Sequence, residues 1–347
     1  MTNALYLYGI AGAAQLPLDQ VSGVEGGVAQ LEHGGLSAII GTPPKGGLRE
    51  LSRETAVRLL LSHQEVLEAA MKRTTVLPVK FGTVAPSEAA IRSLLRGQRD
   101  MLAGMLAEFS GCTQMEIVVL WQLEAVFAEI AAEPGIAAVR KEAQLGASEA
   151  AAVKIGQMVK AGLNRRRLAM QSRLNEVLGP AVMDMAFNAP MDDRMAANLA
   201  VLISKTDAGK FDDALERFDT EYGGRLTLRC VGPLPPSSFA TLLVTFPSAQ
   251  AIARARQALE ITGPLTQKDI TSAFRRLARE HHPDLAAAGT QPEDGRMEEL
   301  TAAYRLLLAC AKAQRGAGGG DGLDEPVLLE VAGQRRVASQ ERERGAA

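Results

Sequence analysis

Residues 265–284, LTQKDITSAFRRLAREHHPD, contain the signals for both ends of one helix. Thr266 is a favourable N-cap, and the acidic Asp269 follows at the third helical position. Pro283 fixes its own φ and moves the residue before it out of the helical region. The pattern therefore predicts a helix that begins after Thr266 and ends by about His281.

This helix is strongly amphipathic. Its apolar residues recur at spacings of three and four: Ile270, Ala273, Phe274, Leu277 and Ala278. Its other face is basic: Lys268, Arg275, Arg276 and Arg279. A second amphipathic pattern follows after a loop, with one apolar face: Met297, Leu300, Ala303, Tyr304 and Leu307. Two such helices are expected to pack as an antiparallel hairpin, with His-Pro-Asp at its tip.

Composition limits what the whole chain can be. At 347 residues and 36.8 kDa, it is long enough for two or three domains. A formal charge of -2 argues against broad nucleic-acid binding, which normally needs a basic field. The first residues lack a Lys or Arg before their apolar run, unlike a secretory signal, and no stretch has the length of a membrane span. We therefore expect a cytoplasmic protein without membrane or nucleic-acid partners.

Residues 1–110 predict a first α+β domain. Short apolar runs at 5–10 and 36–40 predict strands, and Ser52 is a plausible N-cap for a helix that extends to Met71. The next stretch, TTVLPVKFGTV, is β-branched but contains proline, so it predicts an edge strand or a bulge. A helix is expected over 87–109.

Residues 111–247 predict a second α+β domain. Four apolar runs predict strands: 115–121, 199–203, 226–232 and 239–246. A long alanine-rich helix is expected over 137–178, and another helix lies between the second and third strands. Strands and crossing helices then alternate as in a split βαβ sheet. Residues 248–315 form the all-helical third domain, and 316–347 are expected to be a flexible tail.

No pattern of reactive residues predicts catalysis or metal binding. The three cysteines are far apart and are expected to be buried free thiols. His63 lies on the apolar side of its helix, where a packed, hydrogen-bonded histidine is expected. His282 and Asp284 flank a proline and cannot easily converge on one metal ion. The arginine run at 165–167, with Arg173, is interpreted as a solvated helix face rather than a contact surface. We therefore expect no metal, no cofactor and no enzyme activity.

A segment of roughly 65 residues in the C-terminal part of the chain resembles the J domain of Hsp70 co-chaperones. The resemblance rests on the run ALEITGPLTQKDITSAFRRLAREHHPD and, after the loop, on MEELTAAYRLL with its Ala-Tyr pair. In that family the tripeptide and the basic helix face dock on the Hsp70 ATPase domain and stimulate ATP hydrolysis. By resemblance, the Hsp70-binding role is assigned to six residues: His282, Pro283, Asp284, Arg275, Arg276 and Arg279.

The preceding residues resemble the gas vesicle protein F/L family, over roughly 3–245. Three segments carry this resemblance: YLYGI at 6–10, SHQEVLEAAMKRTTVLPVKFGTV at 62–84 and RCVGPLPPSSF at 229–239. Members of the family are accessory proteins of gas vesicle formation. The resemblance implies two α+β domains, the second of them ferredoxin-like, that handle the very hydrophobic shell protein and other vesicle proteins.

Together these features predict a non-enzymatic assembly factor of the gas vesicle that brings a DnaK-type Hsp70 to a vesicle protein. Two other interpretations stay open. The J-like module could serve only as a contact to another vesicle protein. The chain could also be a small ferredoxin-like enzyme with chemistry around Cys230 or His63.

Overall fold

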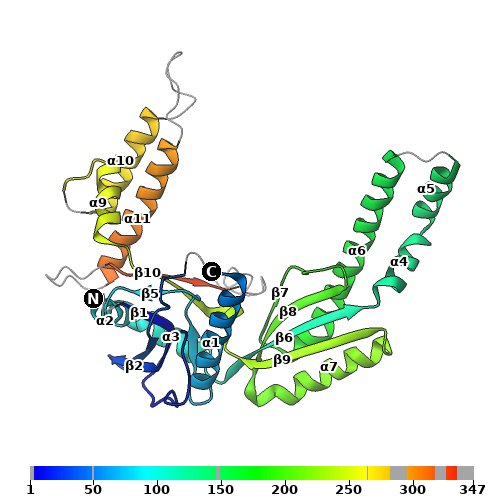
Figure 1. The fold of residues 1–347 in the computed structure, drawn as a ribbon, viewed down its shortest axis with the longest axis horizontal. Helices are drawn as coiled ribbons and strands as arrows, with labels where there is room; N and C mark the ends of the chain where they lie inside the picture. Colours follow the sequence, from blue (N-terminus) through cyan, green and yellow to red (C-terminus); the bar gives the residue numbers. More distant parts are fainter. Residues whose placement is uncertain are drawn as a thin grey trace, which may run out of the picture. The chain divides into compact units, whose positions relative to one another are not determined.

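The structure is a computed structural model that describes residues 4–48, 51–145, 149–263, 265–281, 295–316 and 326–333. The chain folds into two compact units. The first unit contains the residues up to Ser110 together with Ala240–Ala332, and the second contains Gly111–Phe239. Both units combine β-sheet with helices (Figure 1), so the predicted α+β class is confirmed.

The first unit is built on an antiparallel sheet with the strand order β2-β3-β1-β4, and β5 also pairs with β1. The strands are β1 (Leu5–Gly12), β2 (Val28–His33), β3 (Leu36–Gly41), β4 (Val76–Pro78) and β5 (Val84–Ala85). Gly34 and Gly35 join β2 to β3, and both have positive φ. Glycine adopts this conformation without steric cost, which explains why the sequence HGGL makes a two-residue hairpin.

Helix α1 (Arg53–Met71) packs on this sheet. The Ser52 side chain accepts a hydrogen bond from the Thr55 backbone N–H at 3.2 Å, so the predicted N-cap is confirmed. Leu59 and Leu67 on the inner face of the helix are buried against Tyr8 and its neighbours on β1. Burial of this apolar stripe is what fixes the helix on the sheet.

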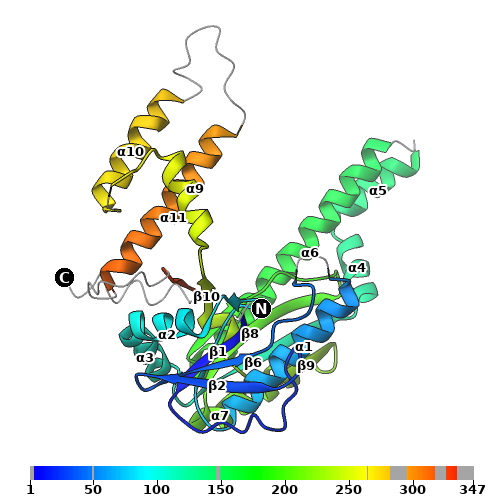
Figure 2. The same cartoon turned by 60° about the vertical axis from the view of Figure 1, so that its left-hand side comes forward.

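Two helices that the sequence predicts as continuous are interrupted in the structure. The segment 87–109 forms α2 (Glu88–Gly97) and α3 (Arg99–Glu108), with Gln98 outside the helical region between them. The segment predicted as one helix over 137–178 forms α5 (Pro134–Leu145) and α6 (Glu149–Leu178). Helices α5 and α6 lie side by side (Figures 1 and 2), so the chain reverses where a single helix was expected. Packing of two apolar faces against each other outweighs the alanine-rich helix propensity across the break.

The second unit contains an antiparallel sheet with the strand order β7-β8-β6-β9. Its strands are β6 (Cys112–Trp121), β7 (Asp184–Phe187), β8 (Met195–Ser204) and β9 (Leu226–Leu234). Helix α4 (Leu123–Ala131), α5, α6 and a short 3-10 turn (Gly179–Ala181) connect β6 to β7. A second 3-10 turn (Lys205–Asp207) and helix α7 (Ala208–Tyr222) connect β8 to β9. The chain order is thus βαββαβ, while the ferredoxin-like assignment itself stays a prediction.

The core of the second unit lies between its sheet and its helices. Alternate residues of β6, among them Ile117 and Val119, are buried together with Leu174 of α6 and Phe218 of α7. Trp121 at the end of β6 donates its indole N–H to the Asp193 carbonyl at 2.8 Å. This single core holds both α6 and α7 on the sheet.

Strand β10 (Thr241–Thr245) follows a short helix, α8 (Ser237–Ala240), and differs from expectation in its location. It belongs to the first unit and not to the second domain, where the pattern predicted it. The Lys80 backbone N–H donates to the Leu242 carbonyl at 2.9 Å, which attaches β10 beside β4. An apolar run predicts that a strand exists but does not say which sheet it joins.

The tail predicted over 316–347 contains a strand, so that prediction is wrong for β11 (Leu328–Ala332). β11 pairs antiparallel with β10, from Thr241 opposite Ala332 to Thr245 opposite Leu328. A Cβ on Gly333, just after the strand, would lie 2.1 Å from the Phe239 carbonyl oxygen, so only glycine fits there. The tail is polar on average, so its composition does not reveal the short apolar run at 328–332 that forms this strand.

Between the paired strands β10 and β11, the described residues form three helices: α9 (Ala249–Ala258), α10 (Gln267–Glu280) and α11 (Arg296–Gly316). Helices α10 and α11 lie side by side in both ribbon views (Figures 1 and 2). We call these three helices the helical module. The module is therefore enclosed in the sequence by two strands that pair with each other, and it is not simply an extension at the end of the chain.

Candidate docking face of the C-terminal helices

Helix α10 begins as its sequence predicts. Thr266 is the N-cap: its hydroxyl oxygen accepts from the Asp269 N–H at 3.2 Å, and its O–H donates to the Asp269 carboxylate. The carboxylate also lies near the positive end of the helix dipole, which stabilises the first turn. The start of α10 is thus set by residues close together in the sequence.

The apolar face of α10 packs on α11 and α9. Ile270 and Leu277 are buried against Leu300 and Leu307 of α11. The ring of Phe274 stacks on Tyr304, with centroids 4.4 Å apart and planes inclined at 23°. The predicted antiparallel pair of helices is confirmed, and its shared core directs the opposite side of α10 to the surface.

The basic residues of α10 all lie on that exposed side: Lys268, Arg275, Arg276 and Arg279. Within the part of the chain that the structure describes, neither Arg275 nor Arg279 has an ion pair. Arg276 differs, because its guanidinium pairs with both Glu260 and Glu280, and the hydrogen bond to Glu260 raises its pKa. With respect to the described residues, Arg275 and Arg279 are therefore exposed and unpaired.

The predicted tip residues His282, Pro283 and Asp284 lie outside the described residues. The end of the helix before them is described. Helix α10 ends at Glu280, and the C-cap His281 donates its backbone N–H to the Leu277 carbonyl at 3.0 Å. The predicted stop at about His281 is confirmed, and the roles of the three tip residues stay predictions.

A second group of arginines lies on α6 in the other unit, and it is held by ion pairs. Arg165 and Arg166 share Glu133, at 2.6 and 2.7 Å. Arg167 pairs with Asp193 at 3.0 Å and stands over the Trp121 ring. The Arg165 side chain is 60% exposed, which agrees with the interpretation of a solvated face. That interpretation is wrong for Arg166 and Arg167, whose side chains are 27% and 13% exposed and join α6 to neighbouring elements.

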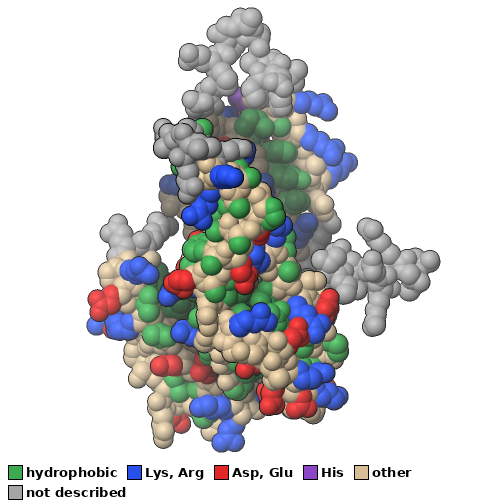
Figure 3. Space-filling model, turned by 90° about the vertical axis from the view of Figure 1, so that its right-hand side faces the viewer, with side chains coloured by type: hydrophobic (Ala, Val, Ile, Leu, Met, Phe, Trp, Pro, Cys, Tyr) green, Lys and Arg blue, Asp and Glu red, His purple; other side chains and the backbone are tan. Residues whose placement is uncertain are grey.

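The arginines lower the pKa of the carboxylates with which they pair. The hydrogen bond from Arg166 lowers the pKa of Glu133. Arg173 pairs with Glu221 of α7 at 2.7 Å, and that hydrogen bond lowers the pKa of Glu221. On the face in Figure 3, acidic and basic side chains are correspondingly intermixed over the second unit. The arginines of α6 thus offer little unpaired charge to a partner.

His63 is a buried core residue of the first unit, as the sequence predicts. The Gly82 N–H donates to the Tyr6 hydroxyl at 3.0 Å, and the same hydroxyl forms a hydrogen bond with His63 Nδ1 at 3.0 Å. The imidazole also stacks on the Tyr8 ring, with centroids 5.4 Å apart. Burial lowers the pKa of His63 to about 4 and keeps the ring neutral. These contacts give His63 a structural role.

In the part of the chain that the structure describes, the cysteines and the other titrating groups form no reactive cluster. Cys112 and Cys310 are buried as predicted, but Cys230 is exposed, because the outer face of β9 is open. Among the described residues, no three His, Cys, Asp or Glu side chains lie close enough together to hold a metal ion. In the same part of the chain, no helix is both long and apolar enough to cross a membrane.

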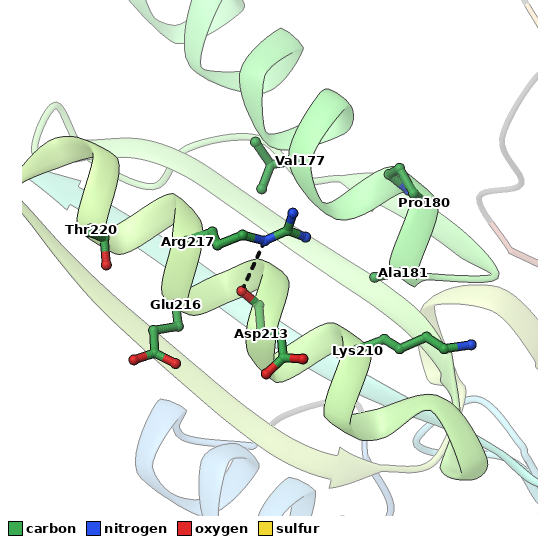
Figure 4. Close-up of a pocket in the computed structure, with 8 residues that line it drawn as sticks. All are labelled: Val177, Pro180, Ala181, Lys210, Asp213, Glu216, Arg217 and Thr220. Atoms are coloured by element: carbon green, nitrogen blue, oxygen red, sulfur yellow. Dashed lines mark hydrogen bonds between the residues drawn. The ribbon is translucent and has the colours of Figure 1, made fainter.

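The second unit also has an open groove between the end of α6 and helix α7 (Figure 4). Its wall includes Lys210, Glu216 and Arg217. Lys210 pairs with Asp207 at 2.7 Å, and Arg217 Nε donates to the Asp213 carbonyl at 3.3 Å. The lining residues include no histidine or cysteine, so the groove lacks a nucleophile with an adjacent imidazole base.

Residues 4–241 match the sequence model of the family described as gas vesicle synthesis protein GvpL/GvpF. The chain belongs to this family. Residues 257–315, which contain α10 and nearly all of α11, match the DnaJ domain, so the chain joins a J domain to a GvpL/GvpF body. Both resemblances drawn from the sequence are confirmed.

Individual relatives agree with the family assignment. Gas vesicle protein F of Microcystis aeruginosa is 28% identical over 192 residues, which cover 54% of this chain and 78% of that protein. Gas vesicle protein F of a Streptomyces species is 26% identical over 242 residues, which cover 67% and 98%. The crystal structure of gas vesicle protein GvpF from Microcystis aeruginosa is 25% identical, with a TM-score of 0.57, and covers 69% of this chain and all of its own.

Proposed function

We propose that this protein assists gas vesicle assembly by holding a vesicle protein and bringing an Hsp70 to it. The observation that carries the proposal is a GvpL/GvpF body joined, in one chain, to a DnaJ domain whose basic face keeps Arg275 and Arg279 exposed. The body would engage the shell protein or another accessory protein. The J domain would engage a DnaK-type Hsp70.

Joining the two parts in one chain has a physical advantage. A vesicle protein held by the body and an Hsp70 held by the J domain meet at an effective concentration of about a millimolar. A hydrophobic shell subunit that is not held in this way exposes a large apolar surface to water and aggregates. The linkage therefore favours capture by Hsp70 over aggregation.

We assign the docking contacts to the basic face and the tip. Arg275 and Arg279 would form charge-assisted hydrogen bonds with carboxylates of Hsp70, which steer association as well as stabilise the complex. His282, Pro283 and Asp284 would complete the contact at the end of α10. The J domain would stimulate ATP hydrolysis by binding one conformation of Hsp70 better than another. We propose that this chain itself catalyses no reaction and acts at gas vesicles in the cytoplasm.

Asp284→Asn tests the proposal. Binding of the parent protein should stimulate ATP turnover by a DnaK-type Hsp70, and the variant should lose about tenfold or more of that stimulation, because a charged contact is removed without a change in size. The control is Asp219→Asn, at an exposed aspartate of α7. Stimulation by Asp284→Asn at the parent level would contradict the co-chaperone role.

A second candidate function follows from the ion pairs of Arg276, which reduce the positive charge of the face. In this alternative, the J-like module contacts only another vesicle protein. Arg275→Ala distinguishes the two functions. Unchanged Hsp70 binding together with lost binding of a vesicle protein would favour the alternative, and the reverse pattern would favour recruitment of Hsp70.

A further inference from the structure

Glu260 has an unusual backbone conformation. It follows the C-cap of α9 with a φ of 56°, and among the described residues no other non-glycine residue has a positive φ. Helices often end on a residue in this conformation, and glycine is favoured there because a Cβ crowds the backbone. A glutamate at such a position calls for a reason beyond the turn itself.

The turn around Glu260 is well fixed. The Glu260 N–H donates to the Gln257 carbonyl at 3.1 Å, and the Ile261 N–H donates to the Arg256 carbonyl at 2.9 Å. These are the two hydrogen bonds of a Schellman helix end. The residues on either side, Leu259 and Ile261, are buried in the core of the module. Because both neighbours are buried, the backbone of Glu260 is held in place and its side chain begins at the surface.

From this position Glu260 reaches the basic face of α10. Its carboxylate accepts a hydrogen bond from Arg276 Nη2 at 2.5 Å. The other nitrogen of the same guanidinium, Nη1, lies 3.3 Å from Glu280, one turn further along α10. The side chains of Arg276 and Glu260 are 49% and 55% exposed, so the pair lies where a partner would make contact. Glu260 is the carboxylate that ties α10 to the end of α9.

The ion pair between Glu260 and Arg276 reduces the positive charge that the basic face of α10 presents to a partner. Arg275 and Arg279 have no ion pair among the described residues, whereas Arg276 is neutralised by acids of its own module. An acidic group of a partner that approaches Arg276 must displace Glu260 or meet its negative charge. Like charges brought together across an interface disfavour that partner.

We infer that Glu260 is a specificity-determining residue of the docking face, which acts by holding Arg276 in an intramolecular ion pair. This inference rests on the proposed function. An acidic group that the partner places opposite Arg275 or Arg279 meets a cation without an ion pair among the described residues, whereas an acidic group opposite Arg276 must compete with Glu260. Glu260 therefore disfavours a partner that places an acidic group opposite Arg276.

A double-mutant cycle tests the inference. The full-length parent, Glu260→Gln, Arg276→Gln and the double variant are each titrated with a DnaK-type Hsp70 in ATP, at low and at physiological ionic strength. Glu260→Gln keeps the side-chain size and removes the shorter of the two ion pairs of Arg276, so that only the longer pair with Glu280 remains. It should therefore tighten binding by about two- to fivefold. The affinity should also fall more steeply with salt, because one more cation contributes. In the Arg276→Gln background, the same change should have no effect.

The control is Glu298→Gln, which removes an exposed acid from α11 of the same module. It should leave the affinity unchanged, and an equal gain from this variant would overturn the inference in favour of a general charge effect. Two other outcomes would also overturn the inference and leave the proposed function intact. One is an affinity of Glu260→Gln equal to that of the parent. The other is an equal gain in affinity from Glu260→Gln when Arg276 is already replaced by Gln. Absence of Hsp70 binding by both the parent and Glu260→Gln would overturn the proposed function, and the inference with it.

Discussion

Helices α6 and α10 are both rich in arginine, yet the structure uses their arginines differently. On α6, each of Arg165, Arg166 and Arg167 forms an ion pair with a carboxylate of its own unit. On α10, Arg275 and Arg279 have no ion pair within the described residues. The two runs would be hard to distinguish by composition alone.

The difference comes from what lies beside each helix. Glu133 stands between α4 and α5, and Asp193 stands just before β8, so the fold brings both carboxylates to α6. Among the described residues, the carboxylates that pair with an arginine of α10 are Glu280 of its own helix and Glu260 from the end of α9, and both pair with Arg276. An arginine face is therefore structural or available according to the carboxylates that the fold supplies, and not according to the number of its arginines.

The two units should differ most in how their stability depends on pH. Between pH 7 and pH 5, the partners of α6 stay charged because their arginines lower the pKa of Glu133 and of Glu221. His63 differs, since burial lowers its pKa from 6.5 to about 4. The unfolded chain therefore binds more protons in this window, and the first unit should lose roughly 2 kcal/mol of stability at pH 5. The second unit should change little.

Urea unfolding at the two pH values, followed by the Trp121 fluorescence of the second unit and by hydrogen exchange in the first unit, measures this effect. His63→Gln serves as the matched variant, because it removes the titrating ring. The variant should be less stable at pH 7 and should lose most of the pH dependence. An equally steep loss of stability in His63→Gln would assign the effect to another group.

Charge reversal on α10 is the next largest test. The double variant Arg275→Glu and Arg279→Glu should weaken Hsp70 binding by at least about tenfold, because two attractive contacts become repulsive. Both side chains are exposed, so thermal unfolding should stay as in the parent. Calorimetric titration measures the affinity. The control reverses Arg305 and Lys312 on α11, and equal weakening by the control would show that only net charge matters.

Arg166→Ala has the smallest expected effect and tests the other helix. Loss of the pair with Glu133, and of the packing of a side chain that is only 27% exposed, should lower the stability of the second unit by about 1 kcal/mol. Hsp70 binding should not change. Denaturant unfolding with Lys160→Ala as the control measures the difference, since Lys160 is exposed on the same helix. Weaker Hsp70 binding by Arg166→Ala would contradict the distinction between structural arginines on α6 and available arginines on α10.

The features predicted most closely depend on residues near one another in sequence. The cap at Thr266, the helix end at His281 and the cap at Ser52 all appear where the pattern predicts them. Each depends on hydrogen bonds or steric limits that act over a few residues. The buried environment of His63 was predicted in the same way, from its place on the apolar side of one helix.

The features that were missed depend on contacts between distant segments. Strand β11 exists because β10 lies open beside it, and the reversal between α5 and α6 depends on packing of their faces. The pair of Glu260 with Arg276 joins two helices across a turn. Neither hydrophobic periodicity nor charge patterning says which distant segments meet. Cys230 was predicted as buried for the same reason, because the pattern of β9 does not show that its outer face is open.

The amino-acid sequence by itself determined the α+β class, the membership in the gas vesicle family, the attached J domain and the amphipathic form of α10. These depend on local propensity, capping and periodic burial, which nearby residues dictate. The tertiary structure alone decided that β10 and β11 enclose the J domain and that the arginines of α6 are occupied while Arg275 and Arg279 are exposed. Whether a charge is free depends on the distances to all other charges, and these are set only when distant segments of the chain pack together.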